Sequence, residues 1–100
     1  MIIYISGPMA GKDEIEDEAD FLTAEVDLRQ QGHEVINPVD LADMIPVDTI
    51  DRRKILNVDL ALIDCADAIY LLPGWMDADG CREEWAWAMA HEKVIMRAEG

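Results

Sequence analysis

The sequence predicts a single α/β domain: a doubly wound, flavodoxin-like or Rossmann-like parallel sheet of about four to five strands with helices on both faces. Short apolar runs alternate along the chain with longer segments of helical periodicity, which is the order typical of parallel sheets. The apolar runs are continuous, as strands buried on both faces require. With 100 residues, 51% of them hydrophobic, the chain (residues 1–100) can bury the core of one domain.

The first half of the chain predicts a strand, a helix and a second strand. Residues 2–5 form a continuous apolar run, which Ser6, Gly7 and a proline end. A helix that closes at Gly32 is expected next, because apolar residues recur at steps of four and three. The residues of this stripe are Ile15, Ala19, Leu22 and Val26, and Phe21 and Leu28 widen it. Residues 34–37 form the second strand, which a proline stops.

The second half predicts two further helix–strand units. Residues 39–47 are expected to be irregular, and Asp48 can cap a helix that runs to about residue 64. The remaining elements are a strand, a helix and a short strand, at residues 68–72, 80–91 and 94–96.

The chain is strongly acidic. It carries 22 Asp and Glu against 8 Lys and Arg, for a net charge of −14. This charge argues against a basic patch that would bind a nucleic-acid backbone. Six of the acids lie between Asp13 and Asp20. The simplest interpretation is a solvated helix start, where negative charge suits the helix dipole, and the alternative is a surface that docks on a basic partner.

Several features point to the cytoplasm. No apolar run reaches the roughly 18–20 residues of a membrane helix, so no contact with a membrane is expected. Residues 1–4 lack the basic segment and cleavage site of a signal peptide. Cys65 and Cys81 are too few for a disulfide scaffold and form no metal-binding pair. We therefore expect free thiols in a reducing compartment.

Two carboxylates stand out near the ends of the predicted strands. Parallel sheets bind ligands at the carboxyl ends of their strands, which here lead into residues 6–11, 37–38 and 73–80. Asp67 lies at the foot of the third strand, and Glu84 lies in the first turns of the last helix. Charge at the rim of such a sheet has little structural purpose, so a catalytic role is expected.

The loop after the first strand carries Gly7 and Gly11 and resembles a phosphate-binding loop. Only three residues separate the two glycines, and Asp13 stands where Ser or Thr would hold magnesium. The dinucleotide fingerprint is also absent, so ATPase and dehydrogenase activities are not expected. The glycines would let the backbone approach a small flat ligand, with Met9 as an apolar contact.

The last helix is predicted to pack a carboxylate against the sheet. Its inward face, at three-and-four spacing, consists of Cys81, Glu84, Trp85 and Ala88. A carboxylate there should be desolvated, hydrogen-bonded or both, although an ordinary first-turn glutamate is the alternative. Asp79 or Asp77 can cap this helix. Tyr4 lies inside the first strand, where a buried hydroxyl needs a partner.

Short motifs spread over nearly the whole chain carry a family resemblance. They are residues 4–9 with Gly11, residues 32–38, Asp59-Leu60, residues 64–67, residues 71–75, and Gly80 with Glu84. Together they are similar to the nucleoside 2-deoxyribosyltransferase superfamily, and most of all to its small phage and bacterial branch.

The resemblance implies an enzyme that cleaves or transfers the N-glycosidic bond of a deoxyribonucleoside or its 5′-monophosphate. At the matching positions, Glu84 would attack C1′ and form a covalent glycosyl-glutamate. Asp67 would protonate or orient the departing base, and Tyr4 would hold Glu84 in place. No metal and no organic cofactor is implied.

The substrate contacts are assigned to the loops at the rim of the sheet and to the matching motifs. They are Ser6, Gly7, Met9, Gly11, Asn37, Gly74, Trp75, Asp77, Asp79 and Gly80. Six residues before the nucleophile, relatives usually carry Ser or Asp, which contacts the sugar or its 5′ end. This chain has Ala78 there, between two acids that would repel a phosphate, so the choice between nucleoside and 5′-monophosphate stays open.

Three tryptophans, Trp75, Trp85 and Trp87, are many for so small a domain. With the resemblance, they favour a homo-oligomer. The alternative function is that of a non-catalytic relative, which would bind a small ligand or dock on a partner through its acids.

Overall fold

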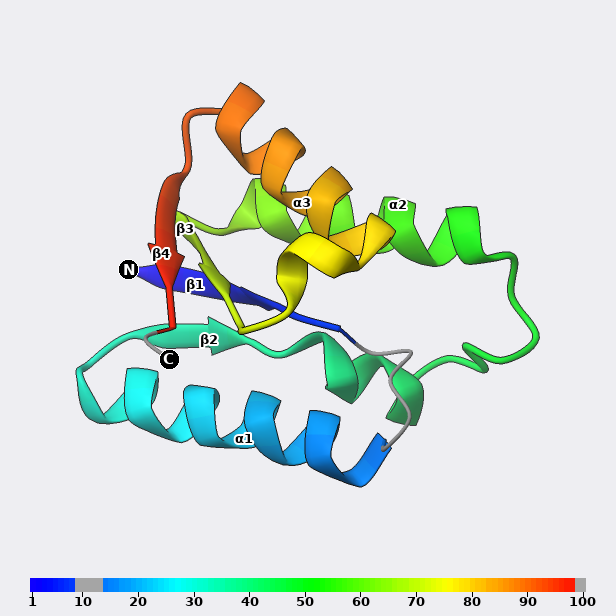
Figure 1. Cartoon of the computed structure of the whole chain (residues 1–100), viewed down its shortest axis with the longest axis horizontal. Helices are drawn as coiled ribbons and strands as arrows, with labels where there is room; N and C mark the ends of the chain where they lie inside the picture. The colour runs from blue at the N-terminus through cyan, green and yellow to red at the C-terminus, as the bar shows by residue number, and fades with distance from the viewer. Residues whose placement is uncertain (9–13, 99–100) are drawn as a thin grey trace.

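Four parallel strands form one sheet in the order β2-β1-β3-β4 (Figure 1). The computed structural model describes residues 1–8 and 14–98. The strands are β1 (Ile2–Ser6), β2 (Glu34–Ile36), β3 (Ala68–Leu71) and β4 (Val94–Arg97). The helices are α1 (Glu14–Gln30), α2 (Arg52–Cys65) and α3 (Asp79–Ala90), with short 3-10 helices η1 (Pro38–Asp43) and η2 (Trp75–Asp77). None of the helices in the described part of the chain is long and apolar enough to span a membrane.

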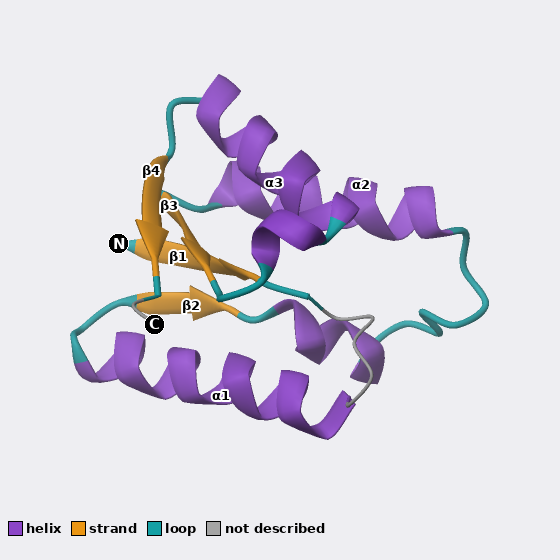
Figure 2. Ribbon diagram, in the orientation of Figure 1, coloured by secondary structure: helices purple, strands orange, loops and turns teal. Residues whose placement is uncertain are grey.

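The predicted α/β fold is confirmed, with helices on both faces of the sheet. Figure 2 shows α1 on one side and α2 and α3 together on the other. Successive side chains of a strand point to opposite faces. In β1, Ile3 and Ile5 therefore pack with α1, whereas Tyr4 packs with α2 and α3. The same alternation directs Ser6 toward the side of α2 and α3.

The strand order also locates the crevice where a ligand can bind. From β1 the chain moves to one side to form β2 and later to the other side to form β3. In parallel α/β sheets, ligands bind at the carboxyl ends of the strands where this reversal occurs. β1 and β3 meet at that point, and their register pairs Ser6 with Leu71 at the carboxyl ends.

The buried face of α1 agrees only in part with the predicted stripe. Among residues 18–30, the buried side chains are Phe21, Ala24 and Leu28, so the two residues that widened the stripe lie in the core as expected. Leu22 and Val26, which were also expected in the core, are 59% and 45% exposed. The helix is turned so that Phe21 and Leu28 face the sheet, which removes their large apolar side chains from water.

The start of α2 also differs from the prediction. The cap is Asp51 rather than Asp48, because the Asp51 carboxylate accepts a hydrogen bond from the backbone N–H of Arg53 at 2.7 Å. Part of the stretch expected to be irregular before this helix forms η1.

The start of α3 has no side-chain cap. Ala78 occupies the N-cap position, so neither Asp79 nor Asp77 plays the predicted capping role. Asp79 instead forms an ion pair with Arg82, one turn further along the helix. The predicted inward face of the helix is confirmed, since Cys81, Glu84 and Ala88 are buried.

Candidate active site

Glu84 is a buried carboxylate held by two hydroxyl groups. Its side chain lies on the inward face of α3, and the residue is only 6% exposed. The Tyr4 hydroxyl donates a hydrogen bond to Glu84 Oε2 at 2.9 Å, and Ser6 Oγ donates one to Oε1 at 2.7 Å. Such charge-assisted hydrogen bonds fix the rotamer of the carboxylate and stabilise its ionised form.

The sequence of β1 accounts for this arrangement. Tyr4 and Ser6 are two residues apart, so both side chains face α3, and each residue is 1% exposed. Hydroxyls so deeply buried need partners, and Glu84 serves both. Ser6 was predicted to contact the substrate, but the structure uses its hydroxyl to hold Glu84.

Asp59 of α2 is the second carboxyl group of the site. It is partly buried, and its Oδ1 atom is buried without a hydrogen-bond partner in the described part of the chain. The side chains of Asp59 and Glu84 are close enough to share a hydrogen bond. Two carboxyl groups can do so only if one of them carries a proton, so the protonation of each group depends on that of the other.

Burial dominates the electrostatics of this pair. Loss of solvent raises the pKa of Glu84 to about 7, and the negative charge of Asp59 adds to the shift. Loss of solvent also raises the pKa of Asp59 to about 6. The hydrogen bonds from Ser6 and Tyr4 favour the ionised form of Glu84. The two groups therefore gain and lose protons as a pair, and the last proton that the pair holds can reside on either carboxyl group.

The neighbouring Tyr4 and Cys81 stay neutral. Burial, followed by the charges of Glu84 and Asp59, raises the pKa of the Tyr4 hydroxyl well above its ordinary value, so that Tyr4 remains a hydrogen-bond donor. Burial raises the pKa of the Cys81 thiol to about 11. Because the thiolate is the reactive form, Cys81 is not a competing nucleophile.

The pair opens onto a cavity of about 1130 Å³ at the carboxyl edge of the sheet. Its walls come from β1, the segment after β2, the first half of α2 and the start of α3. Of the predicted substrate contacts, five line it: Gly7, Gly74, Asp77, Asp79 and Gly80. The volume is that of a pocket for a small molecule.

Two of these glycines have a structural reason to be glycine. A Cβ atom on Gly7 would lie 2.8 Å from Leu72 Cδ1, so β1 can leave the sheet this close to Leu72 only without a side chain. Gly74 has φ +87°, in the left-handed region that favours glycine.

Asp67 does not belong to this site. It directly precedes β3 and therefore lies at the amino ends of the strands, the opposite edge of the parallel sheet. Its Oδ2 accepts a hydrogen bond from the backbone N–H of Ile2 at 2.8 Å. The predicted pairing of Asp67 with Glu84 is wrong, and Asp59 occupies the place expected for it.

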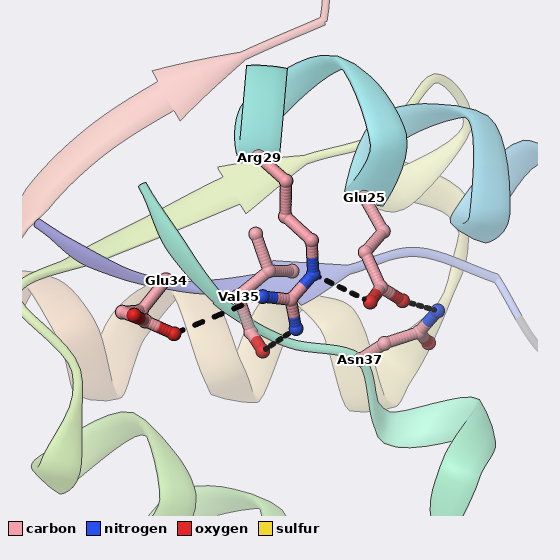
Figure 3. Close-up of polar contacts among 5 residues, drawn as sticks. All are labelled: Glu25, Arg29, Glu34, Val35 and Asn37. Carbon is pink, nitrogen blue, oxygen red and sulfur yellow. Dashed lines mark hydrogen bonds and ion pairs between the residues drawn. The ribbon is translucent and has the colours of Figure 1, made fainter. Parts of the chain in front are cut away.

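Asn37 lies at the carboxyl end of β2, but both ends of its amide are engaged elsewhere. Its Oδ1 accepts from the backbone N–H of Val39 at 3.1 Å, which caps η1. Its Nδ2 donates to Glu25 at 3.0 Å, and Figure 3 shows how Glu25 also binds Arg29. The hydrogen bonds from Arg29 and Asn37 lower the pKa of Glu25, so this cluster fastens α1 to β2.

The remaining predicted contacts lie outside the cavity or outside the described residues. Trp75 packs on Trp85, with ring centroids 5.7 Å apart, and Arg97 lies 5.5 Å from the centre of its ring. Trp75 lines a smaller cavity of about 450 Å³, which lies between the segment after β3 and the end of β4. Met9 and Gly11 lie outside the described residues.

Sequence reasoning missed Asp59, although a signal for it was present. Leu56, Asp59, Leu60 and Ile63 recur at steps of three, one and three, which places the acid on the apolar face of its helix. An acid on a face that must be buried is expected to have a partner or a function.

Comparisons with known proteins agree with this fold. The sequence profile of a family described as "Domain of unknown function (DUF4406)" matches residues 1–97. A search of curated proteins finds no match. Among solved structures, a CMP N-glycosidase of Clostridium botulinum is similar, with a TM-score of 0.67 at 18% identity. A 2-desoxiribosyltransferase from Leishmania mexicana is also similar, with a TM-score of 0.70 at 22% identity.

These likenesses concern the fold. The alignments cover 97% and 96% of this chain but only 67% and 62% of the glycosidase and the transferase chains. The resemblance that the sequence motifs predicted is thus confirmed at the level of the fold.

Proposed function

The chain belongs to the family described as a domain of unknown function (DUF4406), and we propose that it cleaves or transfers the N-glycosidic bond of a nucleoside or nucleoside 5′-monophosphate. The observation that carries this proposal is the pair of adjoining carboxyl groups, Glu84 and Asp59, at the inner wall of a cavity. The fold shared with two enzymes of nucleoside and nucleotide chemistry supports it.

In the first step, a carboxylate oxygen of Glu84 attacks C1′ of the sugar. The bond between C1′ and the base nitrogen breaks, and its electron pair goes to the base. Asp59 gives its proton to the base, either directly or through a water molecule, so that the base leaves in neutral form. The ionised Glu84 also stabilises the positive charge that develops on the sugar.

In the second step, the glycosyl-glutamate ester is cleaved. Asp59, now ionised, takes a proton from the incoming water or second base, which attacks C1′ and releases Glu84 as a carboxylate. Water gives hydrolysis and a second base gives transfer.

Tyr4 and Ser6 prepare the nucleophile for this reaction. Their hydrogen bonds hold both oxygens of Glu84 and favour its ionised state. A carboxylate fixed in advance loses no rotamer freedom when the substrate binds, which lowers the barrier to attack.

The experiment that tests the proposal is a chromatographic measurement of free base. The wild-type protein is incubated with each common nucleoside and deoxynucleoside and with its 5′-monophosphate. We expect release of base from at least one of them, and a loss of several orders of magnitude in Glu84→Ala. Glu18→Ala, on the exposed surface of α1, serves as the control and should match the wild type.

The assignment of the acid is tested by a second pair of variants. Asp59→Asn should lose most of the activity, whereas Asp67→Asn should keep it, because Asp67 lies at the other edge of the sheet. If no substrate releases its base, the chain is a non-catalytic ligand binder. If Asp67→Asn alone is inactive, the assignment of Asp59 is wrong.

A further inference from the structure

The cavity carries basic side chains on one of its walls. Arg52 and Arg53, the first two residues of α2, line it. Among residues 1–8 and 14–98, the other charged lining residues are acids: Asp48, Asp59, Asp77, Asp79, Glu83 and Glu84. An anionic group of a ligand would be repelled by the wall that α3 provides and attracted by the outer part of the α2 wall.

The stability of α2 does not explain these arginines. Arg52, Arg53 and Lys54 stand in succession, in a chain that has only 8 Lys and Arg in all. The amino end of a helix carries the positive end of its dipole, where cations are unfavourable and acids are preferred. The first turn of α2 nevertheless contains no acid. Three cations at this end lower helix stability, so helix stability does not account for Arg52 in the cavity wall.

One face of α2 connects the basic wall to the reacting groups. Arg52, Leu56 and Asp59 follow each other at steps of four and three, and all three line the cavity. Arg52 lies seven residues before Asp59, about 10 Å along the helix axis. That is more than the width of a nucleobase. Arg52 and Asp59 would therefore contact different parts of the substrate. Asp59 would contact the base atom that it protonates, and Arg52 would contact an anionic group further away, either a substituent of the base or a phosphate.

The two arginines have different surroundings. Arg53 Nη1 donates to Glu83 Oε2 at 2.8 Å, an ion pair that joins α2 to α3. For Arg52, the described part of the chain provides no ion-pair partner. A guanidinium group in this position can bind a carboxylate or a phosphate through two parallel hydrogen bonds.

We propose that the substrate is anionic and that Arg52 binds its charged group on the α2 wall of the cavity. This inference rests on the proposed N-glycosidic chemistry and narrows its substrates, because uncharged nucleosides become poor ligands. The charged group is a phosphate on the sugar or an acidic substituent on the base, and both present the same oxygen pattern to a guanidinium.

The test measures binding rather than turnover. The Glu84→Gln protein is titrated calorimetrically with the four common 2′-deoxynucleosides, their 5′-monophosphates, and the 5-carboxy derivatives of 2′-deoxycytidine and 2′-deoxyuridine. We expect at least one anionic probe to bind about tenfold or more tightly than its uncharged parent. Adding Arg52→Gln should remove that preference. Adding Lys54→Gln instead should preserve the preference for the anionic probe. This substitution removes one positive charge from the same turn of α2, but Lys54 is not among the residues that line the cavity.

The probes distinguish the two sources of charge. Arg52-dependent binding of a monophosphate identifies the sugar phosphate, and Arg52-dependent binding of a carboxylated nucleoside identifies the base substituent. Equal binding or no binding of charged and uncharged probes contradicts the inference, as does a preference that survives Arg52→Gln. If anionic probes bind selectively but the wild type releases no base, the proposed function is contradicted and the anion site is not. If the wild type releases base but binds charged and uncharged probes equally, the anion site is contradicted and the proposed function is not.

Discussion

At the scale of single residues, the proposed reaction depends on the adjoining carboxyl groups of Glu84 and Asp59. Each group has a raised pKa because it is removed from solvent. The reaction needs one proton on the pair, with Glu84 ionised for attack and Asp59 protonated for departure of the base. The protonation state of the pair, rather than of either group alone, is therefore expected to control the rate.

The rate should consequently depend on pH in a bell-shaped manner. Below a pH of about 6 both groups hold protons and Glu84 cannot attack, and above about 7 both are ionised and the base leaves without a proton. We expect kcat/KM for base release to be highest between these values. The measurement is a pH series at constant ionic strength. A flat profile from about pH 5 to pH 8 would argue against the shared proton.

Asp59→Asn is the matched control for this profile. It removes the acid, so the alkaline limb of its much lower residual activity should disappear. The acidic limb should stay close to that of the wild type, because Asp59 is already uncharged when Glu84 takes up its proton. A residual profile identical in shape to that of the wild type would assign the limbs to other groups.

At the scale of elements, the path of the chain directly after β1 shapes the candidate site. Ser6 and Gly7 pass so close to the segment after β3 that a Cβ on Gly7 would contact Leu72 at 2.8 Å. We expect Gly7→Ala to lower the free energy of unfolding by about 1–3 kcal/mol, as measured by urea denaturation.

Gly80→Ala is the control for that substitution. Gly80 also lines the cavity, but an added Cβ there meets no atom within 4 Å. Alanine is the better helix former, so Gly80→Ala should be neutral or slightly stabilising. Similar losses in both variants would show that packing against Leu72 is not the reason for Gly7.

Much of the fold, but only part of the candidate site, could be predicted from the sequence alone. Apolar runs and helical spacing predicted the order of strands and helices, and the inward face of α3 placed Glu84 correctly, because these signals are local. Asp67 was misplaced because it adjoins β3 at the amino end of the strand, whereas ligands bind at the carboxyl ends. Helical spacing places Asp59 on the apolar face of α2, but its contact with Glu84 depends on how α2 docks against α3, which no local pattern specifies.

At the scale of the whole molecule, the site lowers the stability of the fold. The raised pKa of Glu84 means that its contribution to stability is present below the ordinary value of 4.5 and is lost as the pH rises through about 7. A protein that carries this buried charge at alkaline pH should be less stable than one with a neutral side chain there.

Glu84→Gln should therefore be more stable than the wild type at alkaline pH. We expect a gain of roughly 2–3 kcal/mol in the free energy of unfolding at a pH of about 8, shrinking toward zero near pH 4. Urea denaturation at several pH values measures it, with Glu18→Gln on exposed α1 as the control. A gain that does not change with pH would show that the buried charge is not its cause.

In the proposed mechanism, Glu84 forms a covalent bond to C1′ of the sugar. Mass spectrometry of the acid-quenched protein during turnover, followed by peptide mapping, detects this bond directly. We expect an added glycosyl mass on the peptide that contains Glu84, present in the wild type and absent from Glu84→Gln. Release of base with no adduct under any quench condition, or an adduct on another residue, would contradict it.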